Sequence, residues 1–176
     1  FLLLIGARAT PIVTEALAKR LTWKGNMLLH KPNSFSITHH WNPKTWPQRS
    51  ELIFHFSKGK NFFRPMMRSP VQKDMSGIIT MTFKKHHPTL IEEFHPAPKY
   101  SHVYKSLYWP TCPDGGRILD LFSGGGGSVE AALELGLEID AVEMDEAYCE
   151  EIARKAEAFL PLDERMREIQ VPLRMA

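Results

Sequence analysis

A run of glycines directly follows an apolar stretch that contains an acid. Residues 118–127 read Ile-Leu-Asp-Leu-Phe-Ser-Gly-Gly-Gly-Gly, with Asp120 inside the apolar stretch and Gly124 as the first glycine. Without a Cβ, glycines let the backbone approach a ligand closely. A helix that begins at such a loop presents free amides and the positive end of its dipole. The segment therefore predicts a ligand-binding loop.

A second acid, Glu143, closes the next strand-like segment, sixteen residues beyond Gly127. A carboxylate at the end of a neighbouring strand can accept hydrogen bonds from both ribose hydroxyls of a nucleoside-type cofactor. A glycine loop alone is often only a tight turn, but the loop, strand and acid together indicate such a site. The glycine spacing departs from the dinucleotide pattern. Because Asp120 precedes the glycines, we expect it to face a cofactor's amino or sulfonium side rather than a pyrophosphate.

Alternating strands and helices must position these residues. After Gly116 the periodicity predicts a strand, a glycine loop, a helix, a strand and a helix at residues 117–122, 124–127, 128–135, 139–143 and 146–159. This order is typical of a βαβα unit with parallel strands and a right-handed crossover.

The first part of the chain predicts shorter elements. Residues 1–5 form a continuous apolar run, as expected of a central strand of an α/β sheet. We expect further strands at 23–30, 51–57 and 77–83, and helices at 11–21 and 100–109, the last ended by Pro110 and Pro113.

The pattern Asp-x-Phe-x-Gly-x-Gly at 120–126, followed by Ala-Val-Glu-Met-Asp-Glu-Ala-Tyr at 141–148, resembles a known family. It is similar to the S-adenosylmethionine-binding half of the DNA amino-methyltransferases, which modify exocyclic nitrogens of adenine or cytosine. The resemblance implies S-adenosyl-L-methionine as cofactor. It places Glu143 on the ribose and the loop near the methionine portion, and the implied binding set includes Asp120, Phe122, Ser123, Gly124, Gly125, Gly126, Glu143 and Met144.

Two further blocks resemble the permuted, beta-type group of these enzymes. His95-Pro-Ala-Pro-Lys-Tyr100 is similar to the His-Pro-x-x-Lys-Pro element that covers the methionine part of the cofactor, which adds His95, Pro96 and Lys99 to the set. Tyr100 replaces the final proline. Residues 29–33 and 50–58 resemble a strand pair of the catalytic half.

This resemblance implies a Rossmann-like methyltransferase fold of the α/β class with a circularly permuted motif order. Residues 1–60 would supply strands and a helix of the catalytic half, and 61–94 a short target-recognition insert. Residues 95–176 would form the S-adenosylmethionine-binding half.

The family's catalytic tetrapeptide, [DNS]-Pro-Pro-[YFW], is missing, since the 176 residues contain no Pro-Pro pair. In the permuted order it would lie upstream of Phe1, where we expect further sequence, so no catalytic residue is assigned. A different interpretation is a catalytically inactive methyltransferase-like subunit that binds nucleic acid, including RNA, or scaffolds a larger assembly. A nucleotide-binding oxidoreductase is disfavoured by the glycine spacing.

Charge divides the chain near Pro110. Residues 1–110 hold 16 Lys and Arg against 5 Asp and Glu, whereas residues 111–176 hold 6 against 15. A basic half favours a polyanionic partner, for which we expect double-stranded DNA. The alternative is a solvated basic face, or two halves of one fold that complement each other's charge. The candidate nucleic-acid contacts are Lys31, Asn33, His39, Trp41, Arg49, Lys58, Lys60 and Arg64.

The two cysteines, Cys112 and Cys149, match neither a disulfide framework nor a zinc site, and the adjacent histidine pairs lack a third ligand at suitable spacing. We therefore expect no metal and a reducing compartment, the cytoplasm with its nucleoid if the source is a prokaryote or a phage. No apolar run reaches the length of a membrane span. A dimer, or a place in a larger assembly, is compatible with the sequence.

Overall fold

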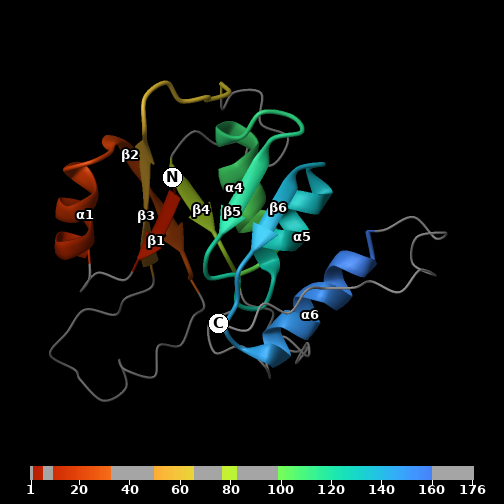
Figure 1. Cartoon of the computed structure of the whole chain (residues 1–176). Coiled ribbons are helices and arrows are strands. Elements are labelled where there is room, and N and C mark those ends of the chain that lie inside the picture. Colours follow the sequence, from red (N-terminus) through yellow and green to blue (C-terminus); the bar gives the residue numbers. More distant parts are fainter. Residues whose placement is uncertain (1, 6–9, 33–49, 66–76, 83–98, 160–176) are drawn as a thin grey trace, which may run out of the picture.

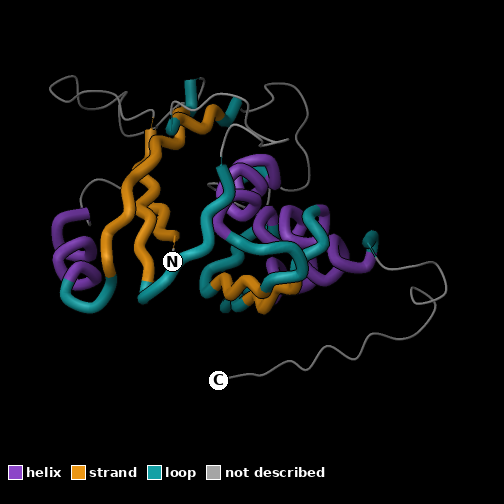
Figure 2. Tube along the Cα trace, turned by 90° about the horizontal axis from the view of Figure 1, so that it is seen from above, coloured by secondary structure: helices purple, strands orange, loops and turns teal. Residues whose placement is uncertain are grey.

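The strands of the computed structural model, which describes residues 2–5, 10–32, 50–65, 77–82 and 99–159, form two sheets (Figure 1). In the four-stranded sheet the order is β1-β3-β2-β4, and β5 and β6 form the second sheet. The strands are β1 (Leu2–Ile5), β2 (Thr22–His30), β3 (Ser50–Ser57), β4 (Ile78–Thr80), β5 (Arg117–Asp120) and β6 (Glu138–Ala141). Seen from above, the two groups of strands are separate, with helices beside the second (Figure 2).

β3 is the central antiparallel strand of the first sheet. It pairs with β1 on one side and with β2 on the other, and β4 runs parallel to β2. Leu29, Ile53 and Ile79, one from each of β2, β3 and β4, are buried and belong to one core cluster. The strands predicted at 23–30 and 51–57 are thus confirmed, with boundaries shifted by one residue.

Helix α4 (Ser101–Thr111) connects the two sheets through the core. Its buried Val103 and Leu107 share one cluster with Ile53 of the first sheet and with Ala131 and Ala132 of the following helix. Burial of these apolar side chains is the main force that holds the two sheets on one helix.

The second sheet and its two helices follow the predicted order of strand, loop, helix, strand and helix. β5 and β6 are parallel with Arg117 opposite Glu138, α5 (Gly127–Glu134) lies between them in sequence, and α6 (Glu146–Glu157) follows. The Asp145 side chain caps α6 by accepting from the amides of Ala147 and Tyr148. The βαβα prediction is confirmed for the described residues.

Three details differ from the sequence predictions. β1 is the edge strand of its sheet among the described residues, whereas its apolar run predicted a central strand. α4 includes Pro110 instead of ending before it, because a proline in the last turn removes only one intrahelical hydrogen bond. α1 (Thr10–Ala18) ends three residues before the predicted boundary.

None of the described helices is both long and apolar enough to cross a membrane. Within the same ranges, no three His, Cys, Asp or Glu side chains come together as a metal site would need.

Candidate functional site

The loop after β5 is fixed by hydrogen bonds to the ends of both strands. A carboxylate oxygen of Asp120 accepts the amide of Phe122 at 3.1 Å, and the Asp120 carbonyl accepts the amide of Val142 at 2.8 Å. The Ser123 amide donates to the Val142 carbonyl at 3.1 Å. The loop therefore wraps around the carboxyl ends of two adjacent parallel strands, which is where ligands bind in open α/β sheets.

Glu143 lies directly across from the first glycine of the loop. Its Oε2 accepts the amide of Gly124 at 2.7 Å, and its Oε1 accepts the amides of Met144 at 2.8 Å and Asp145 at 3.0 Å. The structure thus brings together two features that the sequence placed nineteen positions apart. A carboxylate offers about four acceptor positions, and these three amides use most of them. A ribose that binds Glu143 would have to replace or share one of these bonds.

The last glycines of the loop have a packing role that sequence analysis missed. Gly126 has a φ of 77°, in the left-handed region that favours glycine, and forms the N-cap of α5. A Cβ on Gly127 would lie 2.1 Å from the carbonyl oxygen of Lys99. These two glycines allow α5 to begin against neighbouring backbone, so part of the glycine run serves the fold and not a ligand.

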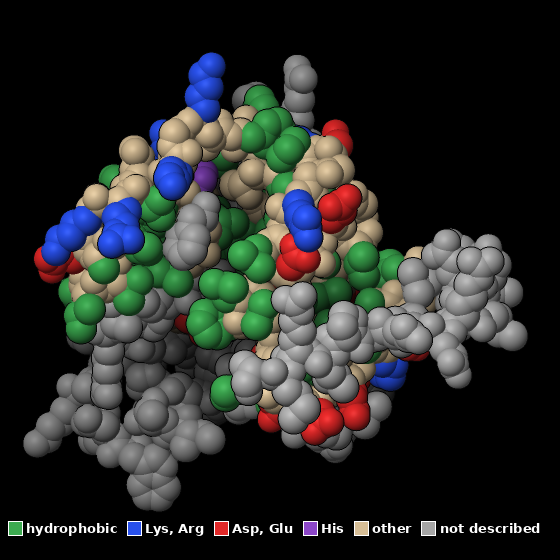
Figure 3. Space-filling model, in the orientation of Figure 1, with side chains coloured by type: hydrophobic (Ala, Val, Ile, Leu, Met, Phe, Trp, Pro, Cys, Tyr) green, Lys and Arg blue, Asp and Glu red, His purple; other side chains and the backbone are tan. Residues whose placement is uncertain are grey.

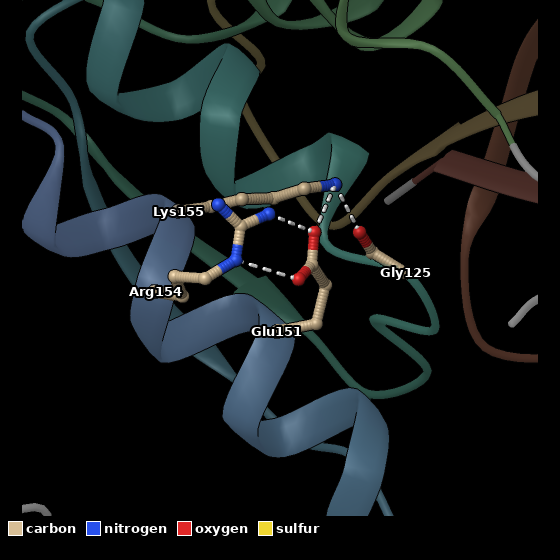
Figure 4. A network of polar contacts seen from close by, with 4 residues as sticks. All are labelled: Gly125, Glu151, Arg154 and Lys155. Atoms are coloured by element: carbon tan, nitrogen blue, oxygen red, sulfur yellow. Dashed lines mark hydrogen bonds and ion pairs between the residues drawn. The ribbon is translucent and has the colours of Figure 1, made fainter. Parts of the chain in front are cut away.

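Lys155 of α6 reaches back to the loop (Figure 4). Its Nζ donates to the carbonyl of Gly125 at 2.5 Å, and Glu151 lies 3.9 Å from the same nitrogen while it accepts two hydrogen bonds from Arg154. Burial lowers the pKa of Lys155, although the charges of Glu130 and Glu151 oppose that effect. The sequence carried no sign of this contact, because it joins a helix to a loop thirty residues away.

Large apolar side chains are exposed at the mouth of the loop. Phe122 is 87% exposed and Met144 is 98% exposed, and both flank the acids described above. Exposed apolar side chains that gather around a few polar groups are typical of a ligand site. The arrangement fits a nucleoside with a planar ring system. The carboxylate can accept hydrogen bonds from its hydroxyls, and the apolar side chains beside the helix N-terminus can pack on its ring.

In sequence, the chain matches no protein-family model and no curated protein. In structure it is similar to M1.HpyAVI in complex with SAM, with a TM-score of 0.69, 15% identity, and coverage of 88% of this chain and 72% of that one. It is similar to the PvuII DNA methyltransferase (cytosine-N4-specific), with a TM-score of 0.69, 12% identity, and coverage of 89% and 58%. A putative DNA modification methylase from Thermus thermophilus, complexed with S-adenosyl-L-methionine, gives a TM-score of 0.57, 15% identity, and coverage of 89% and 62%.

The chain has a methyltransferase fold. The predicted Rossmann-like methyltransferase architecture is thus confirmed.

Within this methyltransferase fold, Lys99, which lies just before α4, pairs with a carboxylate on β3 of the first sheet. Its Nζ lies 3.5 Å from Glu51, which also accepts a hydrogen bond from Lys31. Burial raises the pKa of Glu51, but the hydrogen bond from Lys31 and the charge of Lys99 outweigh burial and leave it below its usual value. His95 and Pro96, predicted with Lys99 as cofactor residues, lie outside the described residues.

The predicted nucleic-acid residues fall into three groups. Lys31 pairs with Glu51. The Arg64 guanidinium lies over the rings of Phe62 and Trp109, 5.3 and 5.4 Å from their centroids, and pairs with Asp114 at 2.7 Å. Lys58 and Lys60 are exposed in the turn after β3. The third group lies outside the described residues and comprises Asn33, His39, Trp41 and Arg49.

The charges of the described residues are unevenly spread over the visible face. In Figure 3 most Lys and Arg side chains lie on the side of the first sheet and α1, and most acids lie near the second sheet and α6. On this face the division of charge along the sequence thus becomes a division in space, and the side with the first sheet and α1 is the basic side.

Proposed function

We propose that this chain serves in S-adenosylmethionine-dependent methylation of an exocyclic amino group of adenine or cytosine in DNA, as a member of the permuted, beta-type group. The observation that carries the proposal is the Glu143 carboxylate, held 2.7 Å from the Gly124 amide at the ends of two parallel strands. Two of the similar structures are complexes with S-adenosylmethionine, and one is named as a cytosine-N4-specific DNA methyltransferase.

The cofactor, when bound, supplies an activated methyl group on its sulfonium. Glu143 would hold the ribose hydroxyls, and Asp120 would face the methionine side. The exposed side chains of Phe122 and Met144 would cover the adenine and exclude water from it. None of these residues changes its bonding in the transfer, so their contribution is to bind and orient.

The acceptor amine is a poor nucleophile, because its lone pair is delocalised into the base. Enzymes that act on a base in duplex DNA flip it out of the stack, and the extruded amine must then be aligned with the methyl group. No described residue of this chain is assigned to hold the amine. The family resemblance assigns that step to the tetrapeptide, and the proposal therefore places it in polypeptide that precedes Phe1 in the permuted order.

Duplex DNA is the proposed partner of the basic side. Lys58 and Lys60 are the predicted phosphate contacts that are exposed among the described residues. Contacts to phosphate fix the position of a protein on DNA without reading the sequence. If the source is a prokaryote or a phage, the same proposal puts the protein in the cytoplasm with the nucleoid. It is compatible with a dimer or a place in a larger assembly.

Calorimetric titration of the protein with S-adenosylmethionine tests the cofactor site. Glu143→Gln keeps the shape of the side chain but removes its charge and one acceptor, so we expect affinity to fall at least about tenfold, or about 1.4 kcal/mol. Glu157→Gln, at the exposed far end of α6, is the matched control and should bind like the parent protein. Equal affinity in Glu143→Gln and in the control would contradict the assignment.

A further inference from the structure

One end of the first sheet is basic. The register of β2 on β3 places Thr22 opposite Ser57, so the start of β2 and the end of β3 lie together. Residues 20–26 and 55–64, which we name the basic end, contain five Lys and Arg and no Asp or Glu. Charges of one sign that gather in this way favour a polyanionic partner.

Three lysines of the basic end make no ion pair among the described residues. They are Lys24, Lys58 and Lys60, and all three are exposed. Arg64 differs, because it pairs with Asp114. An anion can therefore bind the three ammonium groups without breaking an existing pair. Exposed lysines of this kind are typical contacts to phosphate.

Aromatic rings lie beside these lysines. The rings of His55 and Phe63 stack with their centroids 6.0 Å apart, and Phe63 is 51% exposed. Phe62 is 43% exposed and lies under the Arg64 guanidinium. Burial lowers the pKa of His55, and nearby positive charge that includes Lys24 lowers it further, so this lysine lies near the stacked rings. The basic end thus combines cations with exposed ring surface.

The basic end lies at the opposite end of the strands from the candidate cofactor loop. The Arg64 amide donates to the Pro110 carbonyl at 2.8 Å, and the Arg64 side chain pairs with Asp114, so both contacts are to the chain that precedes β5. The cofactor loop follows β5, whose four residues span about 13 Å. In Figure 1 the yellow segment after β3 is at the top of the view, and α6, which contacts the loop through Lys155, is at the bottom.

We propose that the basic end binds unpaired nucleotides of a single-stranded nucleic acid, at a site separate from the cofactor loop. The lysines would hold successive phosphates, and the exposed Phe63 ring would stack on a base. Duplex DNA keeps the faces of its bases inside the stack, so it can use the lysines but not the ring. An acidic peptide can also pair with the lysines, but Asp and Glu offer no planar ring to stack on Phe63. The proposal goes beyond methyl transfer and does not depend on it.

Fluorescence anisotropy on the polypeptide that the gene encodes tests the proposal. The labelled probes are oligothymidylate and oligouridylate of about 12 nucleotides, within the range that one such site covers, and a DNA duplex of the same length. We expect Phe63→Ala to weaken binding to the single strands at least about fivefold, as for one stacked base, and to leave duplex binding nearly unchanged. Phe63→Tyr keeps the ring and should bind like the parent protein.

Phe159→Ala is the matched control, because Phe159 is also 43% exposed but follows α6 on the acidic side. It should bind all three probes like the parent protein. Tighter binding of one of the two single strands would identify DNA or RNA as the source of the nucleotides. Absence of binding to both single strands would overturn the proposal, and so would an equal effect of Phe63→Ala on single strands and duplex.

The lysines give a second readout that does not depend on the packing of Phe63. We expect Lys24→Ala to reduce the slope of log K against log salt by about 0.7 for the single strands. Lys105→Ala, whose lysine pairs with Glu134, should keep the parent slope. Equal slopes in these two variants would contradict the proposal. If polyglutamate displaced the probe as well as an unlabelled single strand does, the surface would instead be one for an acidic protein.

Discussion

Glu143 combines two tasks at the scale of the single residue. It accepts the amides of Gly124, Met144 and Asp145, so it shapes the loop before any ligand arrives. A carboxylate fixed in this way is already oriented for a hydroxyl donor, and binding need not order it. Lys155 adds a second fixed point by holding the Gly125 carbonyl from α6.

Removing the Lys155 amine should loosen the loop and weaken cofactor binding. We expect Lys155→Met to lower the affinity for S-adenosylmethionine about three- to tenfold, which corresponds to roughly one hydrogen bond to a carbonyl. Calorimetry measures the change, and Lys155→Arg should restore most of it because a donor is present again. Lys19→Met, at an exposed residue directly after α1, is the control. Unchanged affinity in Lys155→Met would show that the loop does not depend on this contact.

The sequence predicts those residues of the site that are close in sequence or typical of a motif. Asp120, Gly124 and Glu143 were predicted because a glycine loop and an acid at a strand end are local patterns, and the structure brings the last two into contact. Lys155 and the ring contacts of Arg64 depend on which distant segments meet. A local sequence pattern does not encode contacts between segments that are far apart in the chain.

At the scale of the element, Glu51 connects the first sheet to the start of α4. It lies on β3 and pairs with Lys31 after β2 and with Lys99 before α4. Apolar periodicity predicted β2, β3, β5 and β6, because each strand carries its own pattern. It could not predict the place of β1 in its sheet, because strand order is decided by long-range pairing and not by the strand's own composition.

The Glu51 contacts should make stability depend on acid pH. The pKa of Glu51 in the folded protein is below its usual value of 4.5, so the stabilisation is fully present above that value. It is lost as the pH falls through the lower, folded-state pKa.

Glu51→Gln removes this dependence and leaves two lysines without their partner. We expect the variant to lose about 1–3 kcal/mol of unfolding free energy at neutral pH. The difference from the parent protein should shrink below pH 4.5. Urea unfolding under both conditions measures it, with Glu15→Gln on α1 as control. A constant difference across this range would contradict the assigned charge pairing.

At the scale of the whole molecule, a basic side with the first sheet and an acidic side with the second share one core through α4. The basic side carries the exposed Lys58 and Lys60, and the acidic side carries the candidate cofactor loop. If the first side binds DNA and the second a small cofactor with a single net positive charge, salt must affect the two events differently.

DNA binding should weaken steeply as salt rises, whereas cofactor binding should change little. Each phosphate that the protein no longer neutralises reduces the slope of log K against log salt by about 0.9 in duplex DNA. We therefore expect the double variant Lys58→Ala and Lys60→Ala to reduce that slope by up to about 2 in fluorescence anisotropy titrations. Lys105→Ala, whose lysine pairs with Glu134, should keep the parent slope. Equal slopes in the two variants would place the DNA elsewhere.

The most direct test of the account is transfer of a labelled methyl group from S-adenosylmethionine to DNA by the polypeptide that the gene encodes. We predict that the label is found on the exocyclic amine of adenine or cytosine when the digested DNA is analysed by mass spectrometry. Glu143→Gln should slow the transfer, and Glu157→Gln should not. Tight cofactor binding without any label in DNA, or label only on a ring carbon, would contradict the proposed function.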